Sequence, residues 1–327
     1  MIEAGKGGTI PAYRFAPGAS MRVVLISGSS HPALGAAIAK VLNLEQGRCI
    51  VDRFPDGEHH VEVVEEVRGC DVYLLQTLGP PVDSHLMELL LMVDACRRRG
   101  AARVTAVVPY LAYARHDRRE TGREPLGARL VADMLRVAGV DRLVAMDLHS
   151  PAVEGCFNIP VEHLSAMPLL ADHLQRTATP SSVVVSPDLG AVKRAERYAA
   201  QLKLPVAVVH KHRTSGSQVQ ARRITGDVEG CTPIVVDDMI STAGTVEAAV
   251  NALLEAGCAP EVTVVATHAL LVGPAIDRLQ RLPLRRLLTT DSLPLPMRPP
   301  FQVEVVSVAP LLARSIELLR LGSQHGG

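Results

Sequence analysis

The sequence lacks the features that define several large classes of protein. Its 327 residues contain no apolar run near the roughly 18 residues that a membrane-spanning helix needs. Lysine plus arginine and aspartate plus glutamate each number 34, so the net charge is zero and nothing indicates a nucleic-acid or membrane-surface partner. Residues 1–20 lack the apolar core of a signal peptide, and we expect a loose extension there.

Paired cysteines are also missing, and lysine is scarce. The six cysteines include no Cys-x-x-Cys pair, which argues against zinc and disulfides and favours reduced cysteines in a cytoplasmic protein. Only five of the 34 cationic residues are lysine. A lysine in a polar loop is therefore of interest, because arginine cannot replace a compact ammonium group everywhere.

Short β-branched runs alternate with helical patterns along the chain. The predicted strands are 22–27, 49–52, 72–76, 103–108, 143–147, 183–186, 206–209, 234–237, 262–267 and 286–290, and the amphipathic stretches include 83–99, 126–138, 189–203 and 244–256. Strands that are apolar throughout and separated by helices indicate parallel sheets covered on both faces.

Two such sets of strands suggest a duplicated domain. Segments 29–44 and 186–204 both contain a small polar turn, Leu-Gly-Ala and then a helical pattern. We place the boundary near residue 165, which gives an extension (1–20), an N-terminal domain (21–165) and a C-terminal domain (166–327). Ligands of open α/β sheets bind at the carboxyl ends of the strands, and the motifs described next fall at such ends.

The segment "VVDDMISTAGT" (235–245) joins two adjacent acids to a hydroxyl-rich loop and a predicted helix. Backbone N–H groups and a helix N-terminus favour the binding of a phosphate. The carboxylates of Asp237 and Asp238 would then lie one phosphate-to-sugar length away. There they can accept hydrogen bonds from ribose hydroxyls or meet a metal ion. The alternative is a simple N-capped helix.

A second motif follows the strand at 49–52. In "DRFPDGE", Phe54, Asp56 and Glu58 occupy alternate positions, and an extended chain would place the ring and both acids on one side, as an adenine site needs. The alternative is a hairpin turn at Pro55-Asp56-Gly57, with Phe54 in a core.

Three further segments carry charges at strand ends. "YARHDRRETGREP" (113–125) is either a phosphate clamp of guanidinium groups or a solvated loop. In "MDLHS" and "SPDLG", His149 and Asp188 can hold a divalent cation through water or serve structural roles. "HKHRTSGSQVQ" (210–220) places Lys211 and Arg213 on one side of an extended segment, in a lid or a basic surface loop.

These motifs together resemble the ribose-phosphate pyrophosphokinases, also called PRPP synthetases. The 235–245 segment alone is shared with type I phosphoribosyltransferases, but "FPDGE" with the "VRG" after it and the 113–125 loop resemble only the former family. The resemblance covers essentially residues 21–320, in order and with matching spacing.

The resemblance implies two tandem type I phosphoribosyltransferase-like domains, each a mainly parallel sheet flanked by helices. It implies transfer of the β,γ-diphosphoryl group of ATP to the anomeric hydroxyl of ribose 5-phosphate, giving PRPP and AMP for nucleotide biosynthesis, with Mg²⁺ as cofactor. It also implies a cytoplasmic homo-oligomer, a dimer or hexamer, in which the Phe54 segment reaches a neighbour's ATP site. A phosphoribosyltransferase that uses PRPP and a non-catalytic regulatory homologue remain as alternatives.

Individual roles are carried over from the family's motifs to matching positions. The resemblance implies catalytic roles for Lys211 and Arg213; ATP binding by Phe54, Asp56, Gly57, Glu58, Arg115 and His116; ribose 5-phosphate binding by Arg213, Asp237, Asp238, Ser241, Thr242, Ala243, Gly244 and Thr245; and metal binding by His149 and Asp188. His116 stands where most members of the family carry glutamine.

Overall fold

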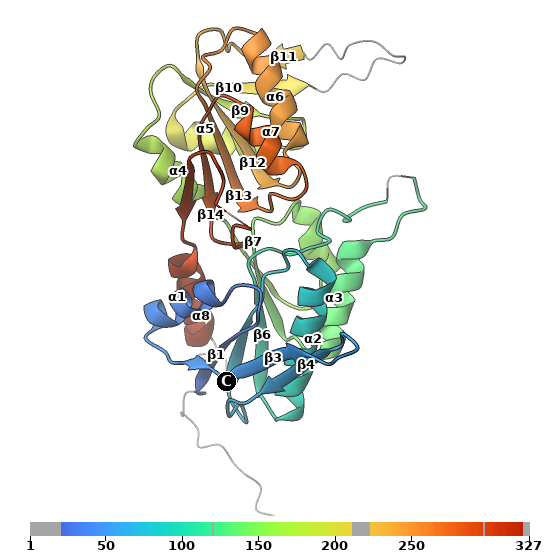
Figure 1. Ribbon diagram of the computed structural model, residues 1–327. Coiled ribbons are helices and arrows are strands. Elements are labelled where there is room, and N and C mark those ends of the chain that lie inside the picture. The colour runs from blue at the N-terminus through green and yellow to red at the C-terminus, as the bar shows by residue number, and fades with distance from the viewer. Residues whose placement is uncertain (1–20, 120, 211–222, 297, 323–327) are drawn as a thin grey trace, which may run out of the picture.

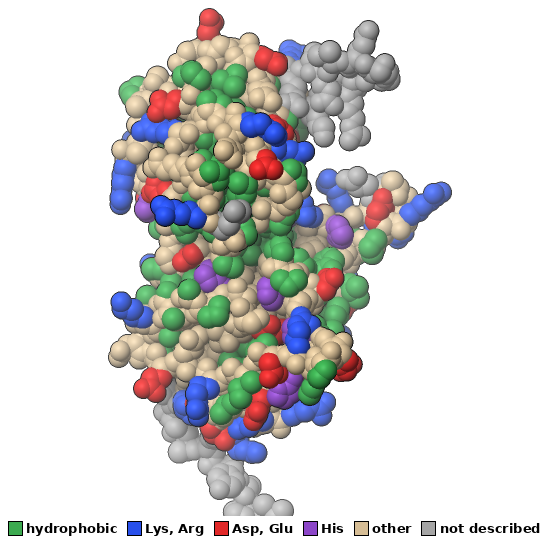
Figure 2. Space-filling model, viewed as in Figure 1, with side chains coloured by type: hydrophobic (Ala, Val, Ile, Leu, Met, Phe, Trp, Pro, Cys, Tyr) green, Lys and Arg blue, Asp and Glu red, His purple; other side chains and the backbone are tan. Residues whose placement is uncertain are grey.

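Two lobes, each built on a sheet with helices packed against it, make up the computed structural model (Figure 1). The structure describes residues 21–119, 121–210, 223–296 and 298–322. Strands and helices alternate along most of this chain, which confirms the predicted α/β class. Within the described ranges, no helix is long and apolar enough to cross a membrane. On the face drawn in Figure 2, cationic and anionic side chains are interspersed.

The first lobe contains a six-stranded parallel sheet in the order β2-β1-β5-β6-β7-β8. Its strands are β1 (Val23–Ser27), β2 (Gln46–Gly47), β5 (Asp71–Leu75), β6 (Arg103–Val108), β7 (Arg142–Met146) and β8 (Val161–Leu164). The helices between them are α1 (Pro32–Leu42), α2 (Val82–Arg98), α3 (Gly127–Ala138) and the 3₁₀ helix η1 (Pro151–Cys156). Every residue of β5 is buried, as expected of a central strand covered on both faces.

The second lobe contains a seven-stranded sheet in the order β11-β10-β9-β12-β13-β14-β15. Its strands are β9 (Ser182–Ser186), β10 (Val206–His210), β11 (Arg223–Thr225), β12 (Thr232–Ile240), β13 (Val262–Ala269), β14 (Leu284–Thr290) and β15 (Val303–Val306). Its helices are α4 (Met167–Gln175), α5 (Val192–Leu202), α6 (Gly244–Glu255) and α7 (Ala275–Gln280), and α8 (Ala309–Gly322) ends the described chain. The edge strand β11 pairs antiparallel with β10.

The two sheets share one strand order when the edge strand β11 is set aside. In each lobe the first strand, β1 or β9, lies between the second strand and the next strand of the sheet, and the remaining strands follow in sequence. This agreement supports the duplication inferred from the two Leu-Gly-Ala segments. The predicted fold of two tandem, mainly parallel domains is confirmed.

The strand predicted at 49–52 forms, but it does not belong to a parallel sheet. It is β3 (Cys49–Arg53), which pairs antiparallel with β4 (His59–Val63) in a separate two-stranded ribbon. The chain reverses between them: the Phe54 N–H donates to the Glu58 carbonyl (2.9 Å) and the Gly57 N–H donates to the Phe54 carbonyl (2.9 Å). A turn this short can join only antiparallel strands.

The lobes share an apolar core. One cluster of buried side chains includes Leu25 and Val144 of the first sheet together with Val184 and Ile234 of the second. The predicted boundary near 165 falls between β8 and α4. The last helix, α8, returns to pack against α1, so the range 166–327 is not spatially separate at its end.

Candidate active site

A cleft of about 970 Å³ opens where loops from both lobes meet. Residues of the first lobe line it at 115–118, 124–125 and 149–150, and residues of the second lobe line it at 188–191, 194 and 237–246. The cleft therefore brings together Arg115, His116, His149 and Asp188 with Asp237, Asp238 and the whole of the 241–245 loop.

The strand order explains why the second lobe places its loops there. After β9, the chain continues to β10 on one side, whereas β12 lies on the other side of β9. The loops that follow β9 and β12 therefore leave the sheet in opposite directions and open a crevice, which is where ligands of open α/β sheets bind. Asp188 follows β9, and Asp237 and Asp238 lie near the end of β12.

The loop before α6 leaves the helix N-terminus open. The N-cap residue is Ala243, in a left-handed conformation (φ 59°), and no side chain of the described residues caps the helix. The alternative of a simple side-chain-capped helix is therefore wrong. Backbone N–H groups at such an end, with the hydroxyls of Ser241, Thr242 and Thr245 beside them, suit an anion.

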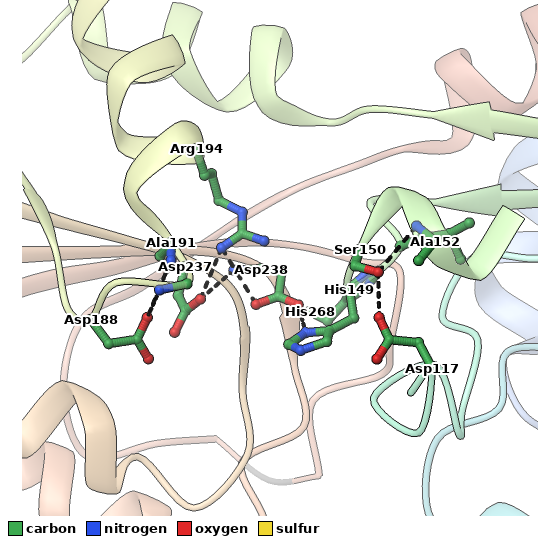
Figure 3. A network of polar contacts seen from close by, with 12 residues as sticks. Asp117, His149, Ser150, Ala152, Asp188, Ala191, Arg194, Asp237, Asp238 and His268 are labelled. Carbon is green, nitrogen blue, oxygen red and sulfur yellow. Dashed lines mark hydrogen bonds and ion pairs between the residues drawn. The ribbon is translucent and has the colours of Figure 1, made fainter. Parts of the chain in front are cut away.

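The acid pair is held by one residue from each lobe (Figure 3). The Arg194 guanidinium, on α5, lies 3.0 Å from Asp237 Oδ1 and 3.5 Å from Asp238 Oδ1. The His149 Nδ1 lies 2.8 Å from Asp238 Oδ2, across the junction between the lobes. The sequence indicated ribose hydroxyls or a metal ion as partners of the pair and did not identify Arg194.

The two carboxyl groups differ in their acidity. Burial and the neighbouring Asp238 charge raise the pKa of Asp237 well above its usual range. Burial alone would also raise the pKa of Asp238, but the His149 hydrogen bond and the Arg194 charge hold the pKa of that carboxyl below its usual range. The same hydrogen bond raises the pKa of His149 against the opposing effect of burial. Asp238 is therefore the carboxylate that keeps its charge most firmly.

His149 and Asp188, predicted to bind a metal, both line the cleft. The Asp188 Oδ1 accepts the N–H groups of Gly190 (2.8 Å) and Ala191 (3.1 Å), which fixes the turn before α5. Within the described part of the chain, no group of three or more His, Cys, Asp or Glu side chains could hold a metal ion. A cation here would thus have few protein ligands.

Asp147 directly follows β7 and does not line the cleft in the described structure. It accepts hydrogen bonds from the Ser165 hydroxyl (2.7 Å), the Ala166 N–H (2.9 Å) and the Thr267 hydroxyl on β13 (2.6 Å). Asp147 therefore ties β7 to the second lobe and supports the loop that carries His149.

Residues 115–118 and 124–125 line the cleft on the first lobe, together with His149 and Ser150. Arg115 and His116 are exposed there, and Ser150 donates a hydrogen bond to Asp117. Asp117 is a cleft residue that the sequence analysis did not single out. Its position directly after Arg115 and His116 was the only available signal.

The predicted adenine-binding residues lie elsewhere. Among the described residues, the lining of this cleft does not include Phe54, Asp56, Gly57 or Glu58, which form the turn of the β3–β4 ribbon. The expectation that they alternate along an extended chain is wrong, because the chain reverses there. The alternative placed Phe54 in a core, yet Phe54 is 49% exposed. Lys211 and Arg213, like residues 1–20, lie outside the described residues.

Comparison with known proteins agrees with this arrangement. Residues 23–139 match the family model described as the N-terminal domain of ribose phosphate pyrophosphokinase, and residues 164–284 match a phosphoribosyl transferase domain. The chain is 42% identical over 293 residues to the ribose-phosphate pyrophosphokinase of Bacillus subtilis, covering 89% of this chain and 92% of that protein. It is 43% identical to the Bacillus caldolyticus protein of the same name, covering 89% and 93%.

A solved structure extends the agreement to three dimensions. The crystal structure of phosphoribosylpyrophosphate synthetase from Mycobacterium smegmatis superposes with a TM-score of 0.86 at 42% identity, covering 91% of this chain and 98% of that one. Identity, coverage and fold agree along nearly the whole length, and this chain belongs to the ribose-phosphate pyrophosphokinase family.

Proposed function

We propose that this chain is a ribose-phosphate diphosphokinase, which transfers the β,γ-diphosphoryl group of ATP to the anomeric hydroxyl of ribose 5-phosphate. The anomeric oxygen forms a bond to the β-phosphorus, the bond between that phosphorus and the α,β-bridging oxygen breaks, and AMP leaves. The products are PRPP and AMP, which places the enzyme in nucleotide biosynthesis, in the cytoplasm.

The proposal rests on one observation: the uncapped N-terminus of α6 and the acid pair line the same cleft. The N–H groups and hydroxyls of the 241–245 loop suit the 5-phosphate, and Asp237 and Asp238 suit the sugar hydroxyls. These two features line the same cleft and follow one another along β12 and its loop, so we expect a ribose phosphate to use both at once.

The opposite wall of the cleft suits the polyphosphate of ATP. Arg115 supplies a planar guanidinium, which can bind phosphate oxygens in pairs, and His116 lies beside it. Facing walls would hold the two substrates in line, and such positioning can supply on the order of 7–11 kcal/mol of the barrier. Lys211 and Arg213 are proposed, from their match to the family's motif, to stabilise charge on the diphosphoryl group as it moves.

The cleft also fits Mg²⁺ as the cofactor. Magnesium is usually held by one or two carboxylates, several waters and the phosphates of the substrate, and a site with few protein ligands agrees with this habit. His149 and Asp188 would hold the ion, directly or through water. When bound, Mg²⁺ would neutralise charge on the ATP phosphates.

A second copy of the chain would complete the ATP site. Phe54 is exposed on a ribbon that does not line its own cleft, so the proposed adenine contacts of Phe54, Asp56, Gly57 and Glu58 need a neighbouring subunit. We therefore propose a homo-oligomer, a dimer or hexamer, with a shared ATP site.

The test is product formation with position-labelled ATP. The protein is incubated with ribose 5-phosphate, Mg²⁺ and ATP labelled at the β-phosphorus, and products are separated by anion-exchange chromatography. Label in PRPP, with unlabelled AMP formed in equal amount, supports diphosphoryl transfer. Reactions without ribose 5-phosphate serve as the control for ATP hydrolysis.

Two other outcomes would reject the proposal. Consumption of PRPP in the presence of a nucleobase, with no PRPP formed from ATP, would indicate a phosphoribosyltransferase. Binding of both substrates without any product would indicate a non-catalytic homologue.

A further inference from the structure

Arg194 contacts both members of the acid pair. Its Nη1 lies 3.0 Å from Asp237 Oδ1 and 3.5 Å from Asp238 Oδ1, and the three side chains are 24%, 17% and 4% exposed. The backbone N–H of Asp238 also donates to Asp237 Oδ1 (2.9 Å). One guanidinium thus lies across two adjacent carboxylates in a largely dry part of the cleft.

The location of Arg194 is unfavourable for the helix that carries it. Arg194 lies in the first turn of α5, where the positive end of the helix dipole disfavours a cation and favours an acid. That turn contains Lys193 and Arg194 and no acidic residue. A residue that breaks a local preference in this way, while meeting two buried acids, is expected at a functional site.

We propose that Arg194 is a positioning residue of the ribose site. Its guanidinium, shared between Asp237 and Asp238, holds the two carboxyl groups side by side so that they accept hydrogen bonds from neighbouring hydroxyls of a ribose phosphate. This inference rests on the proposed function.

The geometry also links this role to the neighbouring loop. Arg194 lies in the first turn of α5, directly after the chain turn that Asp188 fixes, and α5 packs against β9 and β12. The contact between Arg194 and Asp237 therefore fixes the start of α5 over the end of β12. Without this contact, the Asp237 and Asp238 side chains lose the restraint that orients them toward the sugar. The proposed ATP contacts Arg115 and His116 belong to the other lobe, so ATP binding should be less affected.

The test compares Arg194→Gln, Arg194→Lys and a matched control, Lys193→Gln. The control removes one positive charge from the same helical turn, and the exposed Lys193 side chain is not part of the cleft lining in the described structure. For each protein, KM is measured for ribose 5-phosphate and for ATP, ribose 5-phosphate binding is measured by calorimetry without ATP, and thermal unfolding is recorded.

Arg194→Gln is expected to weaken ribose 5-phosphate binding and raise its KM by about tenfold or more, because charge-assisted contacts are lost. The KM for ATP should change less than about twofold, Lys193→Gln should behave as the wild type, and Arg194→Lys should restore part of the loss because an ammonium group still places a charge between the acids.

Equal losses for both substrates, or a loss that follows a lowered melting temperature, would overturn the inference and assign Arg194 a purely structural role. Unchanged ribose 5-phosphate binding in Arg194→Gln would also overturn it. These results differ from failure of the proposed function itself, in which the wild-type protein neither binds ribose 5-phosphate nor forms PRPP.

Discussion

Asp238→Asn should weaken the binding of ribose 5-phosphate much more than the binding of ATP. Asp238 is 3% exposed, and its two oxygens face different partners: Oδ2 faces His149 Nδ1 at 2.8 Å and Oδ1 faces Arg194 Nη1 at 3.5 Å. The asparagine carbonyl can still accept a hydrogen bond from His149. Its NH₂ group would then face the guanidinium, and the negative charge offered to the sugar hydroxyls is lost.

The expected magnitude follows from the loss of one charged acceptor. A hydrogen bond to a charged group contributes about 1.5–3 kcal/mol, which corresponds to ribose 5-phosphate binding that is about 10- to 150-fold weaker. ATP binding should remain nearly unchanged, because Arg115 and His116 belong to the other wall of the cleft.

Calorimetric titration of each substrate separately measures both effects. Asp277→Asn, which removes an exposed carboxylate from α7 of the same lobe, serves as the control. Equal weakening of both substrates, or unaltered ribose 5-phosphate binding, would refute the assignment of Asp238 to the sugar.

Three further changes test other parts of the molecule. Lys211→Ala should lower kcat by about a hundredfold or more with a smaller effect on ribose 5-phosphate affinity, and near-wild-type turnover would remove Lys211 from the mechanism. Thr267→Val should lower the free energy of unfolding by about 1–3 kcal/mol, because Asp147 loses a buried donor; chemical denaturation checks this. Burial lowers the pKa of His268, so the unfolded chain binds a proton that the folded chain does not, and stability should fall as pH drops below about 6.5. His268→Gln should reduce that fall by up to about 1.4 kcal/mol per pH unit in urea unfolding, and an unaltered pH profile would contradict it.

The sequence predicts the second-lobe half of the site well because its residues are contiguous. A buried strand, two acids, a hydroxyl-rich loop and a helix follow one another from 232 to 255, and each local preference agrees with the structure formed. His149 and Asp188 were also predictable as cleft residues, because each follows the carboxyl end of a strand in its own sheet, where ligands of open α/β sheets bind.

Arg194 could not be predicted in the same way. It lies in an amphipathic helix where charged residues are common, and only the packing of α5 over β12 directs it to Asp237. The short strands β2, β8, β11 and β15 also gave no signal, because strands of two to four residues show no clear apolar periodicity. The direction of the β3–β4 ribbon follows from the turn at Pro55-Asp56-Gly57, which the sequence offered as the alternative to an extended chain with Phe54, Asp56 and Glu58 on one side.

The duplicated fold raises the question of what occupies the equivalent crevice position in the first lobe. In the first lobe the equivalent position lies between β1 and β5, and the loop after β1 is already bound by the protein's own side chains. The Ser29 N–H donates to Glu88 Oε1 (2.6 Å) and its hydroxyl to Glu88 Oε2 (2.5 Å), while Ser30 Oγ donates to Gln76 Oε1 (2.6 Å).

Glu88, fully buried on α2, thus accepts hydrogen bonds from the loop after β1, and in the second lobe Asp188 accepts those of Gly190 and Ala191 in the equivalent loop after β9. Gly28 is part of this closure, because a Cβ there would lie 2.6 Å from Glu88 Oε1, a contact that side chains do not tolerate. The first lobe contributes to the cleft from other strands: Arg115 and His116 follow β6, and His149 follows β7. The two lobes therefore supply different walls of one site, which is what a reaction between a sugar phosphate and a nucleotide requires.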